Sequence, residues 1–130
     1  MGVLQNKHLI GLEHTPPEDI QRLIDTGFIF REVLDRPIMK VPSLTGQNIV
    51  NLFFENSTRT RISFELAEKR LSADVTNFST NSSSVSKGEG LKDTIQNIHA
   101  MKMDCVVMRH PAPGSCIHLC QFVDSVIINA

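Results

Sequence analysis

Residues 51–71 constrain the fold of this chain more than any other stretch, because a β-forming block changes there into a helical pattern. Leu52 to Phe54 form a short apolar block rich in β-forming residues, which is typical of a strand buried on both faces. The block ends at Glu55, and from Thr58 onward apolar residues recur at helical spacing without Gly or Pro. The stretch therefore predicts a strand, a tight turn and a helix.

Two kinds of side chain repeat along this predicted helix. Apolar residues recur three or four positions apart, namely Ile62, Phe64, Leu66, Ala67 and Leu71. At the same spacing Arg61 faces Glu65 and Glu65 faces Lys69, so two ion pairs are expected on its surface.

The start of the helix is rich in groups that attract anions. Ser57 stands at the N-cap position, where its hydroxyl can accept from the first free backbone N–H groups while the other unpaired donors point out of the helix end. Thr58 and Thr60 add hydroxyls, Arg59 and Arg61 add guanidinium groups, and the helix dipole adds partial positive charge. A phosphate site is one interpretation. A capped surface helix with two solvated arginines is the other, and the S-T-R-T segment alone leaves both open.

The longer segment E-N-S-T-R-T-R-I-S-F-E after N-L-F-F resembles the carbamoyl-phosphate motif of the transcarbamoylases. One residue separates Glu55 from Ser57, as in the aspartate transcarbamoylase branch, whereas the ornithine enzymes usually carry an extra lysine there. The resemblance implies that Ser57, Thr58, Arg59 and Thr60 hold the phosphate of carbamoyl phosphate. It also implies that Thr60 contacts the carbonyl oxygen.

Composition limits the alternatives. The chain has 130 residues with 41% hydrophobic content, which suits one compact domain. Thirteen basic residues against 14 acidic ones give no global field that would recruit nucleic acid or an anionic membrane, and Trp and Tyr are absent. No apolar run approaches the roughly 18 residues needed to span a bilayer. A soluble, cytoplasmic chain with no nucleic-acid and no membrane partner is expected.

The three cysteines, Cys105, Cys116 and Cys120, form an odd set that suggests free thiols in a reducing compartment. A zinc site at C-I-H-L-C is disfavoured, because His118 would point away from both cysteines on a helix. No metal and no cofactor are therefore expected.

Other segments predict the remaining elements. Thr15-Pro16-Pro17-Glu18 suggests a capping box at the start of a helix that ends near Arg36-Pro37. Its apolar stripe consists of Ile20, Leu23, Ile24, Gly27, Phe28 and Leu34. After the central helix, strands and helices are expected in alternation at residues 74–79, 91–102, 104–108, 115–122 and 125–129. This order predicts an α/β fold, a three-layer domain with a central parallel β-sheet and helices on both faces.

The polar run T-N-S-S-S-V-S-K-G-E-G must be a surface loop, and by composition it is typical of a flexible linker. With the following L-K-D-T it resembles the aspartate transcarbamoylase loop that enters the active site of the adjacent subunit. That resemblance assigns substrate binding in a neighbouring subunit to Ser83 and Lys87.

Arg109 directly follows an apolar run, so it is expected at the carboxyl edge of the sheet beside the Ser57 turn. The segment M-R-H-P resembles the family segment whose arginine contacts the carbonyl side of carbamoyl phosphate. From the residues alone, a rim cation paired with a nearby carboxylate is the alternative for Arg109. For His110, the sequence favours a role in capping the strand end.

The resemblance implies transfer of the carbamoyl group from carbamoyl phosphate to L-aspartate, as in pyrimidine biosynthesis, with Arg59, Thr60 and Arg109 as catalytic residues. It also implies a homotrimer, with or without a regulatory chain. Residues 1–130 would form an incomplete carbamoyl-phosphate-binding domain, because the family's H-P-T-Q segment and its aspartate-binding domain do not follow. Such a chain is expected to be inactive alone. A noncatalytic anion-binding or assembly fragment and an ornithine-type carbamoyltransferase are the alternatives.

Overall fold

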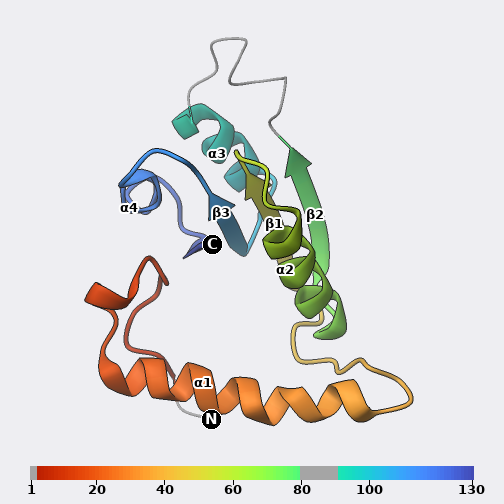
Figure 1. Cartoon of the computed structure of the whole chain (residues 1–130). Coiled ribbons are helices and arrows are strands. Elements are labelled where there is room, and N and C mark those ends of the chain that lie inside the picture. The colour runs from red at the N-terminus through yellow and green to blue at the C-terminus, as the bar shows by residue number, and fades with distance from the viewer. Residues whose placement is uncertain (1–2, 80–90) are drawn as a thin grey trace.

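The structure is a computed structural model that describes residues 3–79 and 91–130 (Figure 1). Four parallel strands form one sheet in the order β2-β1-β3-β4: β1 (Asn48–Phe53), β2 (Asp74–Ser79), β3 (Cys105–Arg109) and β4 (Val126–Asn129). The helices are α1 (Pro17–Arg31), α2 (Thr58–Arg70), α3 (Leu91–Ala100) and α4 (Ser115–Leu119), with short 3-10 turns η1 (Leu12–His14) and η2 (Glu32–Asp35). The α/β fold with a parallel sheet is confirmed.

One face of the sheet carries the main hydrophobic core. Alternate residues of a strand point to opposite faces, so Val50 and Leu52 of β1 point to the same side. There they pack with α3 and α4 in a cluster of buried side chains: Val50, Leu52, Ile95, Ile98, Val106, Met108, Cys116, Leu119, Val123 and Ile127. Cys116 is thus packed as a small apolar side chain, and burial raises the pKa of its thiol to about 11.

The opposite face packs against α2. Its buried apolar cluster is small and consists of Ile49, Phe53 and Val107, with Phe64 of α2 against it. Asn51 also points to this side, where it is fully buried and bonded to Glu68 of α2. Helices therefore cover both faces, but only one of the two interfaces is mainly apolar.

The helix start near Thr15 differs from the prediction. Pro16 occupies the N-cap position of α1, and no side-chain cap bond is made there. The Thr15 hydroxyl instead donates to the Gly11 carbonyl oxygen at 2.7 Å, closing the turn that precedes the helix. A cap is less needed here because Pro17, at the first helical position, has no N–H to satisfy.

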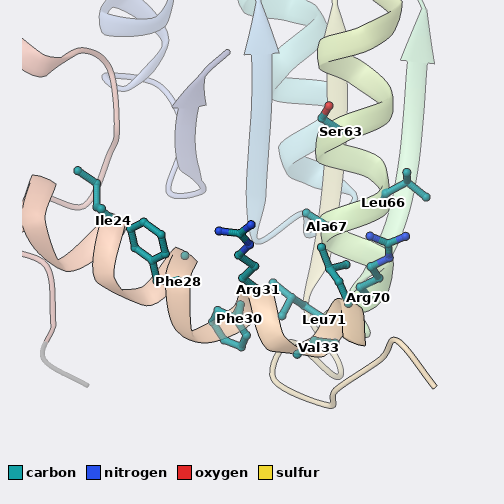
Figure 2. Close-up of a pocket in the computed structure, with 12 residues that line it drawn as sticks. Ile24, Phe28, Phe30, Arg31, Val33, Ser63, Leu66, Ala67, Arg70 and Leu71 are labelled. Carbon is teal, nitrogen blue, oxygen red and sulfur yellow. The ribbon is translucent and has the colours of Figure 1, made fainter. Parts of the chain in front are cut away.

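The apolar stripe of α1 is largely exposed. Phe28 is 65% exposed and Ile24 is 49% exposed, and both line an apolar groove of about 690 Å³ between α1 and α2 (Figure 2). Leu66 of α2, 45% exposed, lines the same groove. The periodicity of α1 therefore identifies an apolar face that the described residues leave uncovered.

Candidate active site

The junction between β1 and α2 lies at the carboxyl edge of the sheet. Helix α2 begins at Thr58 after Ser57, as predicted, and the Arg61 N–H donates the first helical bond to the Ser57 carbonyl oxygen at 3.0 Å. The Ser57 hydroxyl makes no capping bond, which differs from the prediction. Its backbone, with φ −146° and ψ 68°, lies outside the extended geometry that directs an N-cap side chain to the first turn.

A cavity of about 230 Å³ opens beside this helix start. It brings three of the expected anion-binding residues together, since Ser57, Thr58 and Arg61 all line it. The remaining wall consists of Phe53, Glu55, Asn56, Asn77 and Phe78. The cavity thus combines a helix N-terminus, two hydroxyls and one guanidinium, which are the donors that a small anion requires.

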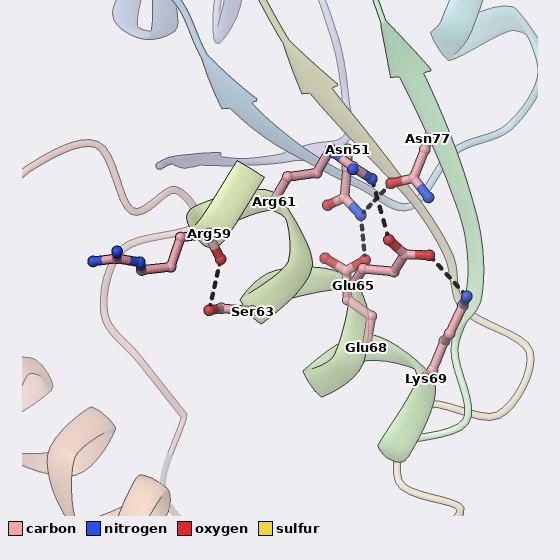
Figure 3. Close-up of polar contacts among 8 residues, drawn as sticks. All are labelled: Asn51, Arg59, Arg61, Ser63, Glu65, Glu68, Lys69 and Asn77. Carbon is pink, nitrogen blue, oxygen red and sulfur yellow. Dashed lines mark hydrogen bonds and ion pairs between the residues drawn. The ribbon is translucent and has the colours of Figure 1, made fainter. Parts of the chain in front are cut away.

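Arg59 and Thr60 do not line the cavity. The Arg59 side chain is exposed and extends away from the helix start (Figure 3), while its carbonyl oxygen accepts a bond from the Ser63 hydroxyl at 2.8 Å. Thr60 is half-buried in the first turn. In this structure the phosphate-binding set expected from the sequence is therefore only partly convergent.

Arg109 shares the carboxyl edge with the cavity. It is paired in register with Phe53, and its carbonyl oxygen accepts from the Phe54 N–H at 2.9 Å. Its Nε donates to Glu55 Oε1 at 2.6 Å, so the guanidinium is engaged with a carboxylate that lines the cavity. This is the pairing that the sequence offered as the alternative for Arg109, but no sequence pattern identified Glu55 as the partner.

The predicted ion pairs on α2 are confirmed. Glu65 lies 3.3 Å from Arg61 and 2.8 Å from Lys69 (Figure 3). The hydrogen bond from Lys69 lowers the pKa of Glu65, and Asn77 and Arg61 act in the same direction. Arg61 therefore pairs with Glu65 of its own helix and also lines the cavity.

His110 has a structural role in this structure, as the sequence favoured. Its Nδ1 accepts from the Ala112 N–H at 2.9 Å, and its ring packs edge-on against Phe54 at 4.9 Å. These contacts fix the loop that follows β3.

Ser83 and Lys87, predicted to act in a neighbouring subunit, lie outside the described residues. Within residues 3–79 and 91–130 no group of three or more His, Cys, Asp or Glu side chains could hold a metal ion. The same residues contain no helix with the length and apolar character required to cross a bilayer.

Comparison with known proteins assigns the family. Residues 7–130 match the family described as aspartate/ornithine carbamoyltransferase, carbamoyl-P binding domain. The chain belongs to the aspartate/ornithine carbamoyltransferase family. Its resemblance to the aspartate branch is confirmed by relatives that carry that name.

The chain is 63% identical over 123 residues to the aspartate carbamoyltransferase catalytic subunit of Christiangramia forsetii, covering 95% of this chain and 40% of the relative. It is 53% identical over 130 residues to that of Flavobacterium psychrophilum, covering 100% of this chain and 42% of the relative. The chain thus spans about 40% of the length of these carbamoyltransferases.

Solved carbamoyltransferase structures share its fold. The M. jannaschii aspartate transcarbamoylase catalytic subunit matches 96% of this chain and 40% of its own length, at a TM-score of 0.85 and 39% identity. The Trypanosoma cruzi enzyme in complex with carbamoyl phosphate matches 98% of this chain and 41% of its own length, with a TM-score of 0.85 and 34% identity.

Proposed function

We propose that this chain supplies the carbamoyl-phosphate site of an aspartate carbamoyltransferase. The reaction transfers the carbamoyl group to the amino group of L-aspartate and gives N-carbamoyl-L-aspartate and phosphate, a step of pyrimidine biosynthesis. The observation that carries the proposal is the cavity at the start of α2, where Ser57, Thr58 and Arg61 converge at the carboxyl edge of a parallel sheet. The T. cruzi relative, solved with carbamoyl phosphate, supports this substrate.

The chemistry requires electrostatic stabilisation. The aspartate amine attacks the carbamoyl carbon, negative charge develops on the carbonyl oxygen, and the bond from carbon to the phosphate oxygen then breaks while the amine loses a proton. Donors that meet this charge in place lower the barrier. In our proposal Ser57, Thr58, Arg59 and Thr60 hold the phosphate, and Thr60 with Arg109 polarises the carbonyl oxygen.

Two side chains must move for this set to converge. Arg59 is exposed and points away from the helix start, and Arg109 is paired with Glu55. Both have room to turn, because Arg59 lies at the surface and the Arg109 side chain is 37% exposed. A doubly charged phosphate can compete with one carboxylate for these guanidinium groups, since both anions accept paired N–H donors.

The proposed assembly is a cytoplasmic homotrimer, with or without a regulatory chain, in which Ser83 and Lys87 reach the site of an adjacent subunit. A lysine ammonium group is a compact positive charge that suits contact with a phosphate. The aspartate names of the relatives support L-aspartate over ornithine as the acceptor. A noncatalytic anion-binding or assembly fragment is the second candidate, favoured by the Arg59 side chain, which extends away from the start of α2 in this structure.

Arg59→Ala tests the proposal in a full-length catalytic chain that contains these residues. The variant should lose about 3 kcal/mol of transition-state stabilisation, a hundredfold or more in kcat, because one donor to the developing charge is removed. The measurement is phosphate release from carbamoyl phosphate at saturating aspartate, with ornithine as the acceptor control.

Arg31→Ala is the matched control, because Arg31 is exposed on α1 and lines the groove between α1 and α2, not the cavity at the start of α2. It should keep wild-type turnover. Near-normal turnover by Arg59→Ala would refute the role given to Arg59, and phosphate release without aspartate would contradict the transfer reaction.

A further inference from the structure

A chain of four polar side chains lies between α2 and the sheet: Glu65, Asn77, Asn51 and Glu68 (Figure 3). Asn51 is fully buried and Glu68 is 5% exposed. The Asn51 Nδ2 group donates to Glu68 Oε1 at 2.8 Å and to Asn77 Oδ1 at 3.1 Å. Both hydrogens of the Asn51 amide are therefore used.

The orientation of these amides is set from the Glu65 end. Glu65 is ion-paired with Lys69 and Arg61, and its pKa is lowered by these partners and by a hydrogen bond from Asn77. Because a carboxylate only accepts, Asn77 directs its NH2 group to Glu65 and its Oδ1 to Asn51. Asn51 must then direct its own NH2 toward Asn77 and Glu68, which leaves Asn51 Oδ1 beside the second oxygen of Glu68.

Those two oxygens are both buried and both lack a hydrogen-bond partner among the described residues. Figure 3 shows the Asn51 amide and the Glu68 carboxyl group edge to edge, with the oxygen atoms on the same side of the pair. Two acceptors in this position repel, and each would carry the cost of a buried unsatisfied group. A proton on Glu68 Oε2 removes both problems, because the carboxylic acid then donates to Asn51 Oδ1.

The surroundings favour the neutral acid. On α2 itself the carboxylate of Glu65 repels a negative charge on Glu68. The nearby cations of this helix, Arg61 and Lys69, are already paired with Glu65. On β3 the thiol of Cys105 stays neutral, because burial raises its pKa to about 12, and β2 offers the uncharged Asn77. Burial and the Glu65 charge raise the pKa of Glu68 to about 6, although the hydrogen bond from Asn51 Nδ2 lowers it. A bond that only the neutral acid can donate shifts the pKa further upward.

We propose that Glu68 and Asn51 form a reciprocal acid–amide pair that opens when Glu68 ionises, and that the closed pair positions Asn77 beside the candidate anion cavity. Asn77 lines that cavity, and Asn51 is its bonded neighbour in the sheet. When Glu68 loses its proton, a negative oxygen faces Asn51 Oδ1, so the Asn51 amide turns or shifts and Asn77 loses a fixed donor. Glu68 is thus a pH-sensitive positioning residue. The inference stands whether or not the cavity binds carbamoyl phosphate.

The pair is tested by NMR on the wild-type chain. The ¹³C signal of the Glu68 carboxyl group should titrate with a midpoint of about 6 or higher. The side-chain ¹H–¹⁵N signals of Asn77 should shift with the same midpoint, because the amide responds to the state of the pair. A Glu68 midpoint near the ordinary 4.5, or Asn77 signals that do not follow Glu68, would overturn the proposal.

Glu68→Gln provides the second arm. A glutamine amide can accept from Asn51 Nδ2 and donate to Asn51 Oδ1, so the pair stays closed at every pH. The Asn77 signals of this variant should remain at their low-pH position throughout the titration. Asn77 signals that titrate equally in Glu68→Gln would assign the change to another group and contradict the proposal. Glu18→Gln, an exposed carboxyl group on α1, is the control and should titrate like wild type.

The stability of the fold gives a third measurement. The pKa of Glu68 is raised in the folded chain. The stabilisation of the folded state by protonated Glu68 is therefore complete below pH 4.5 and is lost as pH rises through about 6. Relative to Glu68→Gln, the wild-type folding equilibrium should fall roughly 30-fold over this window. Parallel pH profiles for the two proteins would refute ionisation of a buried acid.

Discussion

The face of the sheet under α3 and α4 buries ten apolar side chains in one cluster, whereas the described cluster under α2 buries three. The α2 face contains Asn51 and Glu68 instead, and it ends at the cavity lined by Ser57 and Arg61. The two faces of one sheet therefore differ: apolar burial dominates one, and the other contains buried polar groups and ends at the candidate anion cavity.

The division has an energetic cause. Burial of apolar area stabilises a fold without directional requirements, so the α3 and α4 side needs only complementary volume. Polar groups under α2 lose their hydrogen bonds to water and need hydrogen bonds of correct geometry within the protein to replace them. Asn51 makes such bonds to Glu68 and Asn77. The α2 face is consequently the one whose packing we expect to respond to pH and to a bound anion.

Leu52→Ala measures the apolar side of this comparison. Leu52 is fully buried under α3 and α4, so its truncation should cost about 2–5 kcal/mol of unfolding free energy, read from urea denaturation. Leu66→Ala is the control. Leu66 is 45% exposed on α2, and its truncation should cost about 1 kcal/mol or less. Equal losses for the two variants would mean that the cost of truncation does not follow burial in the cluster under α3 and α4, which would contradict the comparison.

Arg61→Ala measures the polar side. Loss of a charged donor from the cavity should weaken inorganic phosphate binding by about 1.5–3 kcal/mol, at least tenfold in Kd by isothermal titration calorimetry. Lys69→Ala is matched, because it also removes an ion pair with Glu65 but does not line the cavity. Its Kd should stay near wild type. Equal weakening by both variants would mean that Glu65, and not the cavity, controls binding.

The sequence predicts elements best where its pattern changes abruptly. The N-cap position of Ser57 and the bounds of β2 agree with the prediction. Ser57 follows the point where the apolar run of β1 stops at polar residues, and β2 ends where a long polar run begins in the sequence. The cap at Thr15 fails because Pro16 and Pro17 displace the helix start beyond the threonine. Periodicity marks an apolar face on α1, but it carries no information on whether another element covers that face.

Contacts between distant residues were harder to predict. The sequence placed Arg109 at the same edge as Ser57 and left two roles open, and strand register then brings Arg109 beside Glu55. Nothing periodic links Asn51 to Glu68, which are 17 positions apart on different elements. The available signal was a single amide inside an apolar strand, since a buried polar group requires a partner.

Glu55→Gln carries the smallest expected effect. The ion pair between Glu55 and Arg109 is more than a third exposed on both sides, so its loss should change stability by less than about 1 kcal/mol. Phosphate should bind a few-fold more tightly, because a negative charge leaves the cavity wall and the Arg109 guanidinium is released. Glu32→Gln, which breaks a comparable pair with Arg36 after α1, should leave Kd unchanged. Weaker phosphate binding by Glu55→Gln would instead mean that Glu55 holds Arg109 where the anion needs it.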